Sequence, residues 1–252
     1  MENKVEVIIQ PITIRFSLFE DEVIYHFAGH ANQQLDNMEK LMKIDVENST
    51  LLDCNVGFLP VASVTLIRGE KNIIVDPGAH HIGTYGLLEN ALNQRGLNFN
   101  DIDIVVVTHW HHDHFSNLPL FKNADLVIGK GELDWAIETS SELEVKSKTE
   151  YVNNTLEVSS DSPLELAKGV VAIHTPGHTP NSISVIVEEE SETVGILGDL
   201  AMTRNEYEKR EFSHWYTEEQ LHLLNSSLEK VNTYKLTKII PGHDRAFNIT
   251  KK

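Results

Sequence analysis

A short segment dense in metal-ligand side chains, residues 105–117, constrains this chain more than any other feature. It reads V-V-V-T-H-W-H-H-D-H-F-S-N, an apolar run followed at once by His and Asp. Imidazole and carboxylate groups suit zinc and other first-row metals. Four potential ligands fall within six positions: His109, His111, Asp113 and His114. Such a cluster is hard to explain as ordinary surface or core residues. The segment therefore predicts a metal centre at the end of a strand.

The spacing within this segment predicts two groups of ligands. Side chains two apart along an extended backbone share a face, so His109 and His111 can point the same way. Asp113 and His114 follow where we expect the chain to turn into a helix, and they can face a second metal ion. His112 alternates away from the first pair, and we expect it to pack or face solvent.

Three further segments repeat the local arrangement of strand, sharp turn and ligand. VVAIHTPGH ends in His178, TVGILGD ends in Asp199, and KIIPGH ends in His243. Loops at strand ends are where rigid scaffolds present functional groups. One P-G-H is a weak signal, but four such loops in one chain predict a shared site. Seven ligands without a cysteine also argue against a structural metal site, which is normally closed by four ligands.

The rest of the chain predicts a single domain over residues 1–252, without repeats, low-complexity tracts or linkers. Short β-branched runs that end in turn-forming residues predict strands. They lie at 5–9, 13–16, 61–67, 73–75, 102–108, 126–128, 170–174, 183–187, 193–197 and 238–240. Helical spacing marks 84–95, 217–231, which opens with a T-E-E-Q capping box, and 31–44. Strands interleaved with helices favour two mixed sheets packed face to face, with helices outside.

The net charge of the chain bears on whether it binds nucleic acid or a small molecule. The formal charge of −17, from 38 acids against 21 bases, opposes an extended grip on nucleic acid. It does not exclude cleavage of a single phosphodiester, because bound metal ions add positive charge. No run is apolar and long enough to span a membrane, and the start carries no secretory pattern. With Cys54 as its one cysteine, we expect a reduced, cytoplasmic protein.

These motifs together resemble the metallo-β-lactamase superfamily, whose H-x-H-x-D-H motif corresponds to residues 109–114. The likeness extends from about residue 61 to residue 247. NIIVDPG matches an earlier landmark of the family, in which Asp76 would steady the metal loop from behind. Pro77 stands where the family usually has threonine, which we expect to change the turn and not the chemistry.

The resemblance implies an α+β fold, an αββα four-layer sandwich with the metals at one edge of the two sheets. It implies three ligands for one ion, three for the other and one bridge: His109, His111 and His178; Asp113, His114 and His243; and Asp199. The expected cofactors are two divalent ions, with Zn²⁺ first and Mn²⁺ or Fe²⁺ as options. The expected nucleophile is a hydroxide shared by the ions, and Asp113 is the catalytic residue expected to orient it and pass a proton to the leaving group.

Within the superfamily the ligand set excludes some branches. True β-lactamases replace the bridging aspartate, and flavodiiron proteins carry glutamate where this chain has His111. Glyoxalase II enzymes continue into a helical region after the last ligand, whereas nine residues follow His243. Two alternatives stay open: a hydrolase of small esters or lactones resembling acyl-homoserine lactonases, and a phosphodiesterase or ribonuclease resembling the type associated with histone pre-mRNA cleavage. A mononuclear iron persulfide dioxygenase ranks third, and an inactive metal-binding protein has no support.

TPGHTP and PGHD fit the lactonases, while HHDHFSNLPLF and IIPGHDRAF fit the ribonuclease type more closely. The charge favours a small-molecule substrate, so we rank the lactone or ester reading first. The roles of His80, His81, Tyr207 and Tyr216 are left unassigned. The oligomeric state also stays open, with a homodimer as one option, and the segment 31–44 could serve as core, lid or dimer contact.

Overall fold

The computed structural model describes residues 2–19, 22–28, 56–78, 84–213 and 215–249. Within them the strands form two six-stranded sheets and one three-stranded sheet. The segment 31–44, Cys54, His80 and His81 lie outside the described residues. None of the helices in the described part of the chain is both long and apolar enough to cross a membrane.

The first large sheet has the order β1-β5-β6-β7-β8-β9. Its strands are β1 (Lys4–Ile9), β5 (Val64–Arg68), β6 (Asn72–Val75), β7 (Ile104–Val106), β8 (Asp125–Gly129) and β9 (Thr155–Val158). β1, β5 and β6 pair antiparallel, and β6 to β9 pair parallel. The carboxyl ends of the four parallel strands therefore meet at one edge of the sheet.

The second large sheet has the order β10-β11-β12-β13-β14-β15. Its strands are β10 (Leu164–Ala167), β11 (Val170–His174), β12 (Ile183–Glu188), β13 (Thr193–Gly198), β14 (Lys238–Pro241) and β15 (Phe247–Asn248). β13 and β14 are parallel, and all other pairs are antiparallel. β11, β13 and β14 thus run in the same direction, and their carboxyl ends share an edge. The strands predicted at 183–187 and 193–197 are confirmed as β12 and β13, which pair antiparallel.

The two sheets pack face to face, and alternation along each strand separates an inner core from two outer ones. In β6, Ile73 and Val75 join the core between the sheets, while Ile74 faces the other way. In β14, Ile240 joins the inner core and Ile239 the outer core of the second sheet. Both faces of β6 and of β14 are covered, which is why their Ile and Val runs are continuously apolar.

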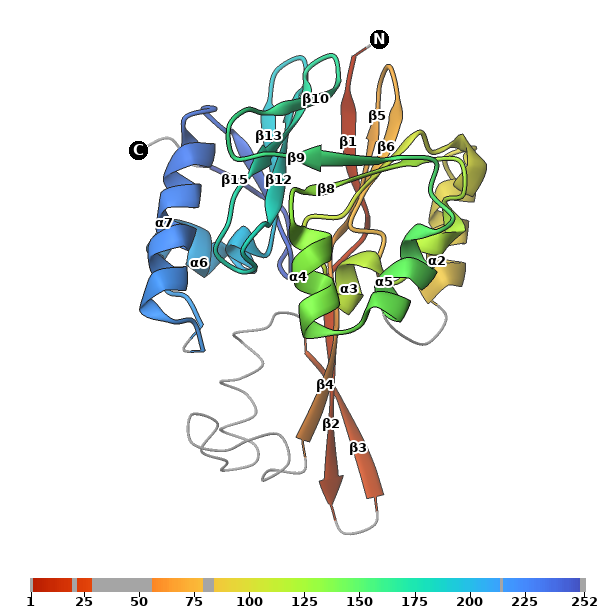
Figure 1. Cartoon of the computed structure of the whole chain (residues 1–252). Helices are drawn as coiled ribbons and strands as arrows, with labels where there is room; N and C mark the ends of the chain where they lie inside the picture. The colour runs from red at the N-terminus through yellow and green to blue at the C-terminus, as the bar shows by residue number, and fades with distance from the viewer. Residues whose placement is uncertain (1, 20–21, 29–55, 79–83, 214, 250–252) are drawn as a thin grey trace.

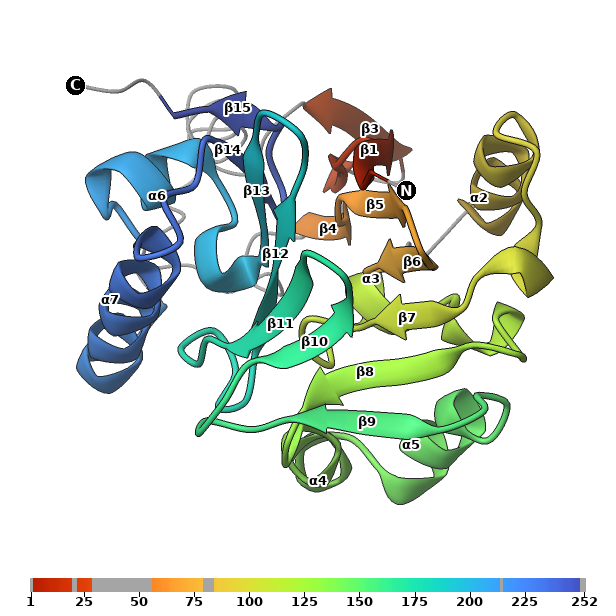
Figure 2. The same cartoon turned by 90° about the horizontal axis from the view of Figure 1, so that it is seen from above.

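Helices cover the two outer faces, as Figure 2 shows from above. On the first sheet lie α2 (Thr84–Asn93), α3 (His112–Phe115), α4 (Glu132–Thr139) and α5 (Glu142–Thr149), with the short turns η1 (Phe99–Asp101) and η2 (Leu118–Leu120). On the second lie η3 (Asp199–Ala201), α6 (Arg204–Lys209) and α7 (Glu218–Asn232). The predicted capping box is present at α7, where Thr217 and Gln220 bond each other's backbone N–H groups. The predicted αββα sandwich of two mixed sheets is confirmed.

The third sheet was not predicted. β2 (Ile12–Phe19), β3 (Glu22–Ala28) and β4 (Val56–Val61) pair antiparallel in the order β3-β2-β4 and extend beyond the two large sheets in Figure 1. The single strand predicted at 61–67 is wrong: β4 ends at Val61 and β5 begins at Val64. Ser63 separates them, because its N–H and hydroxyl bond the carbonyl oxygens of Gly242 and Pro241. These two bonds hold Ser63 where the chain passes from the three-stranded sheet into the first large sheet.

Candidate metal centre

Three imidazoles meet where β7 and β11 end. His109 Nε2 lies 3.0 Å from His111 Nδ1, and His178 Nε2 lies 2.9 Å from the same atom. Three ring nitrogens this close are the geometry of ligands around one ion, since zinc sits about 2.0–2.1 Å from each imidazole nitrogen. His109 and His111 share a face as the H-x-H spacing predicts, and His178 reaches them from the second sheet.

A second group lies beside the first. His243 Nε2 is 3.3 Å from Asp113 Oδ2, and His114 Nε2 is 3.7 Å from the same oxygen. Asp113 and His114 stand in the single turn of α3, and His243 follows β14. The three side chains are buried and offer ligand atoms within 4.8 Å of one another.

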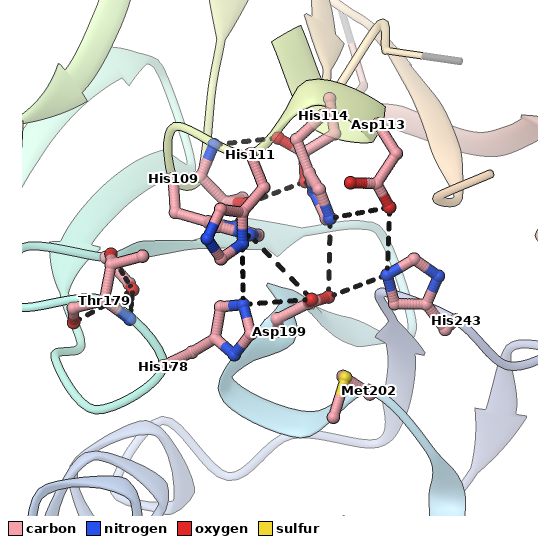
Figure 3. A network of polar contacts seen from close by, with 12 residues as sticks. His109, His111, Asp113, His114, His178, Thr179, Asp199, Met202 and His243 are labelled. Atoms are coloured by element: carbon pink, nitrogen blue, oxygen red, sulfur yellow. Dashed lines mark hydrogen bonds and ion pairs between the residues drawn. The ribbon is translucent and has the colours of Figure 1, made fainter. Parts of the chain in front are cut away.

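Asp199 lies between the two groups, and its two carboxylate oxygens face different sides. Oδ2 is 3.3 Å from His178 Nε2 and 3.8 Å from His109 Nε2. Oδ1 is 3.4 Å from His243 Nε2 and 3.5 Å from His114 Nε2. Figure 3 shows the carboxylate in the centre, with His109, His111 and His178 on one side of it. This arrangement fits one carboxylate shared by two cations.

Buried polar atoms without partners mark the same place. Among the described residues, the buried atoms that have no hydrogen-bond partner include Asp113 Oδ2, His114 Nε2 and Asp199 Oδ1. An unpaired buried polar atom normally costs about 1–3 kcal/mol, so native structures keep few of them. Three that face one point, all of types that bind first-row metals, fit a divalent cation there.

The charges around these residues support that reading. Burial lowers the pKa of His109 and of His111, and it lowers the pKa of His178 to about 4, so these rings stay neutral and can bind metal. Burial alone would raise the pKa of Asp199, but His243 and His114 hold it well below its usual range. Although burial opposes it, Asp76 and Asp199 raise the pKa of His114, and Asp199 raises the pKa of His243, so these carboxylates favour positive charge that a metal cation would supply.

Asp76 and Thr108 orient two of the rings from behind. Asp76 Oδ2 lies 2.9 Å from His114 Nδ1, and Asp76 also accepts bonds from the N–H and hydroxyl of Thr108. The Thr108 oxygen in turn lies 3.1 Å from His109 Nδ1. Nδ1 of His114 then donates to Asp76 and Nδ1 of His109 to Thr108. Nε2 of each ring is left unprotonated, with its lone pair directed into the centre. Asp76 has a φ of 51°, a left-handed conformation that aims its carboxylate at α3.

Two glycines let the ligand loops approach each other. Gly198 has a φ of 53°, and a Cβ there would lie 2.8 Å from Thr108 Cβ. A Cβ on Gly242 would lie 2.0 Å from Asp199 Oδ1. The glycines before Asp199 and His243 are therefore required by close packing as well as by the turn itself.

The structure brings all seven predicted ligands together. His112 points outward, with Nε2 3.2 Å from Glu144 Oε1 of α5, as its alternation predicts. Tyr207 donates to Asn232 Oδ1 at 2.6 Å, within the outer core of the second sheet. The Tyr216 oxygen lies 2.6 Å from His178 Nδ1, so it orients that ring from outside.

Sequence reasoning missed Thr108, Tyr216 and Glu132 as partners of the ligand loops. Thr108 directly precedes His109 and ends the apolar run, which is a signal that could have been used. Tyr216 lies 38 positions from His178, and Glu132 lies 22 positions from Trp110 and 47 from Thr179; neither belongs to a motif.

A family model described as the metallo-beta-lactamase superfamily matches residues 57–243. A Methanocaldococcus jannaschii protein named a probable metallo-hydrolase is 32% identical over 190 residues, covering 71% of this chain and 85% of that protein. Metallo-beta-lactamase domain-containing protein 1 of Xenopus laevis is 28% identical over 190 residues, covering 75% of this chain and 73% of its own. An N-acyl homoserine lactonase of a Bacillus species is 26% identical over 183 residues, covering 64% and 72%.

Relatives differ in length: the match spans 49% of an uncharacterized Caenorhabditis elegans protein that is 29% identical over 197 residues and 76% of this chain. A solved structure of an N-acyl homoserine lactone hydrolase, with N-hexanoyl-L-homoserine bound at its catalytic metal centre, superposes with a TM-score of 0.64. It covers 96% of this chain and 93% of its own at 19% identity, a likeness that shows the fold.

Proposed function

The chain belongs to the metallo-beta-lactamase superfamily and is a metal-dependent hydrolase, and from this premise we propose that it uses two metal ions to open an ester or lactone of a small molecule. The observation that carries the two-ion proposal is Asp199, whose oxygens face His178 on one side and His243 on the other at 3.3 and 3.4 Å. A single ion held by His109, His111 and His178 would leave the buried Asp113 Oδ2 and His114 Nε2 unpaired.

The ligands divide as their positions suggest: His109, His111 and His178 for one ion, Asp113, His114 and His243 for the other, and Asp199 for both. When bound, the divalent ions would lower the pKa of a coordinated water towards about 7 and polarise the carbonyl under attack. We expect Zn²⁺, with Mn²⁺ or Fe²⁺ as options.

Asp113 is the residue we assign to proton transfer. Its side chain is buried in the half of the centre that also holds His114 and His243, with Oδ2 3.3 Å from His243 Nε2. A carboxylate there can accept a proton from the attacking water and return it to the departing alkoxide, so that the opened product leaves as an alcohol and a carboxylic acid. Asp76 fixes the segment that carries this carboxylate, because it bonds Thr108 before it and His114 after it.

A small neutral or weakly charged substrate fits the charge of the chain. The formal charge of −17 repels a phosphate backbone, and neutralising phosphates normally takes clustered Lys and Arg. The 26% identical lactonase supports an acyl lactone within this class.

The second candidate is hydrolysis of a phosphodiester. It is favoured by the segments HHDHFSNLPLF and IIPGHDRAF, and by the 28% identity with metallo-beta-lactamase domain-containing protein 1. The same centre could polarise a phosphoryl oxygen, and its cations would offset the negative charge locally.

The test is turnover of an acyl lactone and of a short single-stranded RNA by metal-replete protein, with His109→Ala as the blank. We expect lactone opening without RNA cleavage. RNA cleavage alone would replace the proposal by the second candidate. Metal analysis of the same preparation should give about two ions per chain, and one iron per chain would instead favour the persulfide dioxygenase reading.

A further inference from the structure

We propose that Glu132, the first residue of α4, is a positioning residue that sets metal affinity in one half of the centre, the His109, His111 and His178 group. The inference rests on the proposed two-ion function. Glu132 is not a predicted ligand and belongs to no motif. Its side chain is nevertheless fully buried, which is unusual for a carboxyl group unless it is bonded.

Both carboxylate oxygens of Glu132 are occupied by the ligand loops. Oε1 accepts the N–H of Trp110 at 2.9 Å, and this peptide unit lies between His109 and His111. Oε2 accepts the hydroxyl of Thr179 at 3.0 Å, and Thr179 directly follows His178. Both oxygens bond the ligand loops, and Glu132 is not among the side chains whose ligand atoms come together, so it acts through the loops.

The two loops come from different sheets. Trp110 follows β7 of the first sheet, while Thr179 and Asn181 follow β11 of the second, and Glu132 also accepts a backbone bond from Asn181. The end of β8 packs closely against the loop that follows β11, since a Cβ on Gly129 would lie 1.7 Å from the Asn181 carbonyl oxygen. β8 and α4 therefore place one carboxyl group where it can fix the third ligand relative to the first two.

The other half of the centre does not depend on Glu132. His114 is held by Asp76, 2.9 Å away, and His243 by its N–H bond to the Met202 carbonyl oxygen, also 2.9 Å. Loss of Glu132 should thus weaken one ion and spare the other. The chain should still fold, because the N–H of Ile183 bonds the Thr108 carbonyl oxygen and joins the same two loops through the backbone.

The experiment is titration of purified protein with Co²⁺, followed by visible absorbance and by the number of ions bound. The design uses two backgrounds that each lack one half of the centre, His243→Ala and His178→Ala. In the His243→Ala background, Glu132→Ala should weaken the remaining ion by about 10–100-fold, the usual effect of losing a group that orients ligands. In the His178→Ala background it should change the affinity little.

Two further variants separate positioning from general destabilisation. Glu132→Gln should restore most of the affinity, because its amide oxygen can accept from Trp110 and its amide N–H can donate to Thr179. The Thr179 hydroxyl can then turn to Ser182 Oγ, 2.6 Å away. Ala136→Gly destabilises the same helix but leaves these bonds intact, so it should lower the melting temperature without changing Co²⁺ affinity.

Unchanged affinity in Glu132→Ala, or an equal loss in both backgrounds, would overturn the role of Glu132 and leave the two-ion proposal standing. A wild-type protein that binds one ion would overturn the two-ion proposal. The effect of Glu132→Ala on the affinity for that ion would still test whether Glu132 is a positioning residue. A wild-type protein that binds no Co²⁺ would overturn both.

Discussion

At the scale of single residues, Asp199 carries the most specific prediction because its two carboxylate oxygens face different halves of the centre. Asp199→Ala removes a shared anionic ligand, and we expect lactone hydrolysis to fall by more than about 100-fold, the upper range for groups that merely orient ligands. Steady-state kinetics and circular dichroism should show an inactive but folded protein. His112→Ala is the matched control in the same motif, and its activity should stay within about twofold.

Asp76 tests the support behind the ligands. Asp76→Asn keeps the size of the side chain but weakens the charged bond to His114 Nδ1, 2.9 Å away. We expect metal affinity to fall by about 10–100-fold, measured by competition with a chromophoric chelator. Affinity equal to that of the wild type would show that α3 alone orients His114.

At the scale of elements, the turn from β13 into η3 depends on Gly198. Gly198→Ala would place a Cβ against Thr108 in a left-handed conformation, and we expect it to lower the free energy of unfolding by about 1–3 kcal/mol. Urea unfolding measures this. Gly86→Ala in α2 is the control, because nothing lies within 4 Å of its added Cβ, and it should stabilise by about 0.5–1 kcal/mol.

Besides its backbone pairing with β5, β1 contributes one carboxylate, that of Glu6, to ion pairs with neighbouring elements. Glu6 contacts Lys4, Arg68 and Arg95 at 2.8, 2.7 and 2.5 Å, and bonds from these cations lower its pKa to about 2 despite its burial. A lowered folded-state pKa stabilises the protein above the unfolded value near 4.5, and this contribution is lost as pH falls towards 2. Glu6→Gln should therefore be destabilising at pH 7, and the difference from wild type should shrink by pH 3 in urea unfolding.

At the scale of the whole molecule, the centre joins the edges of two sheets, so its occupancy should stabilise the entire fold. At free metal 100 times the dissociation constant, binding to the native state adds about 2.7 kcal/mol. We expect a chelator to lower the melting temperature of the wild type and Zn²⁺ to restore it. A wild-type melting temperature that a chelator does not change would mean that the ligand loops are fixed without metal. Asp199→Ala should respond much less to both treatments.

The sequence by itself determined the candidate ligands and most strands of the two large sheets. Imidazole and carboxylate chemistry, the period of two in H-x-H and the strand-turn-ligand repeats are local properties of the chain, and they led to seven residues that the structure brings together. The apolar runs and the capping box at Thr217 are local as well. The helix at 217–231 and the strands at 183–187 and 193–197 could be predicted for that reason.

Only the tertiary structure decided what depends on distant partners. β9, β10 and β15 are short strands that exist because a neighbouring strand offers backbone bonds, and β4 and β5 separate because Gly242 and Pro241 bond Ser63. Glu132 has no signature of its own, since a buried glutamate differs from a surface one only in what surrounds it. Local chemistry shows which side chains could bind a metal, but packing between sheets fixes which groups hold them there.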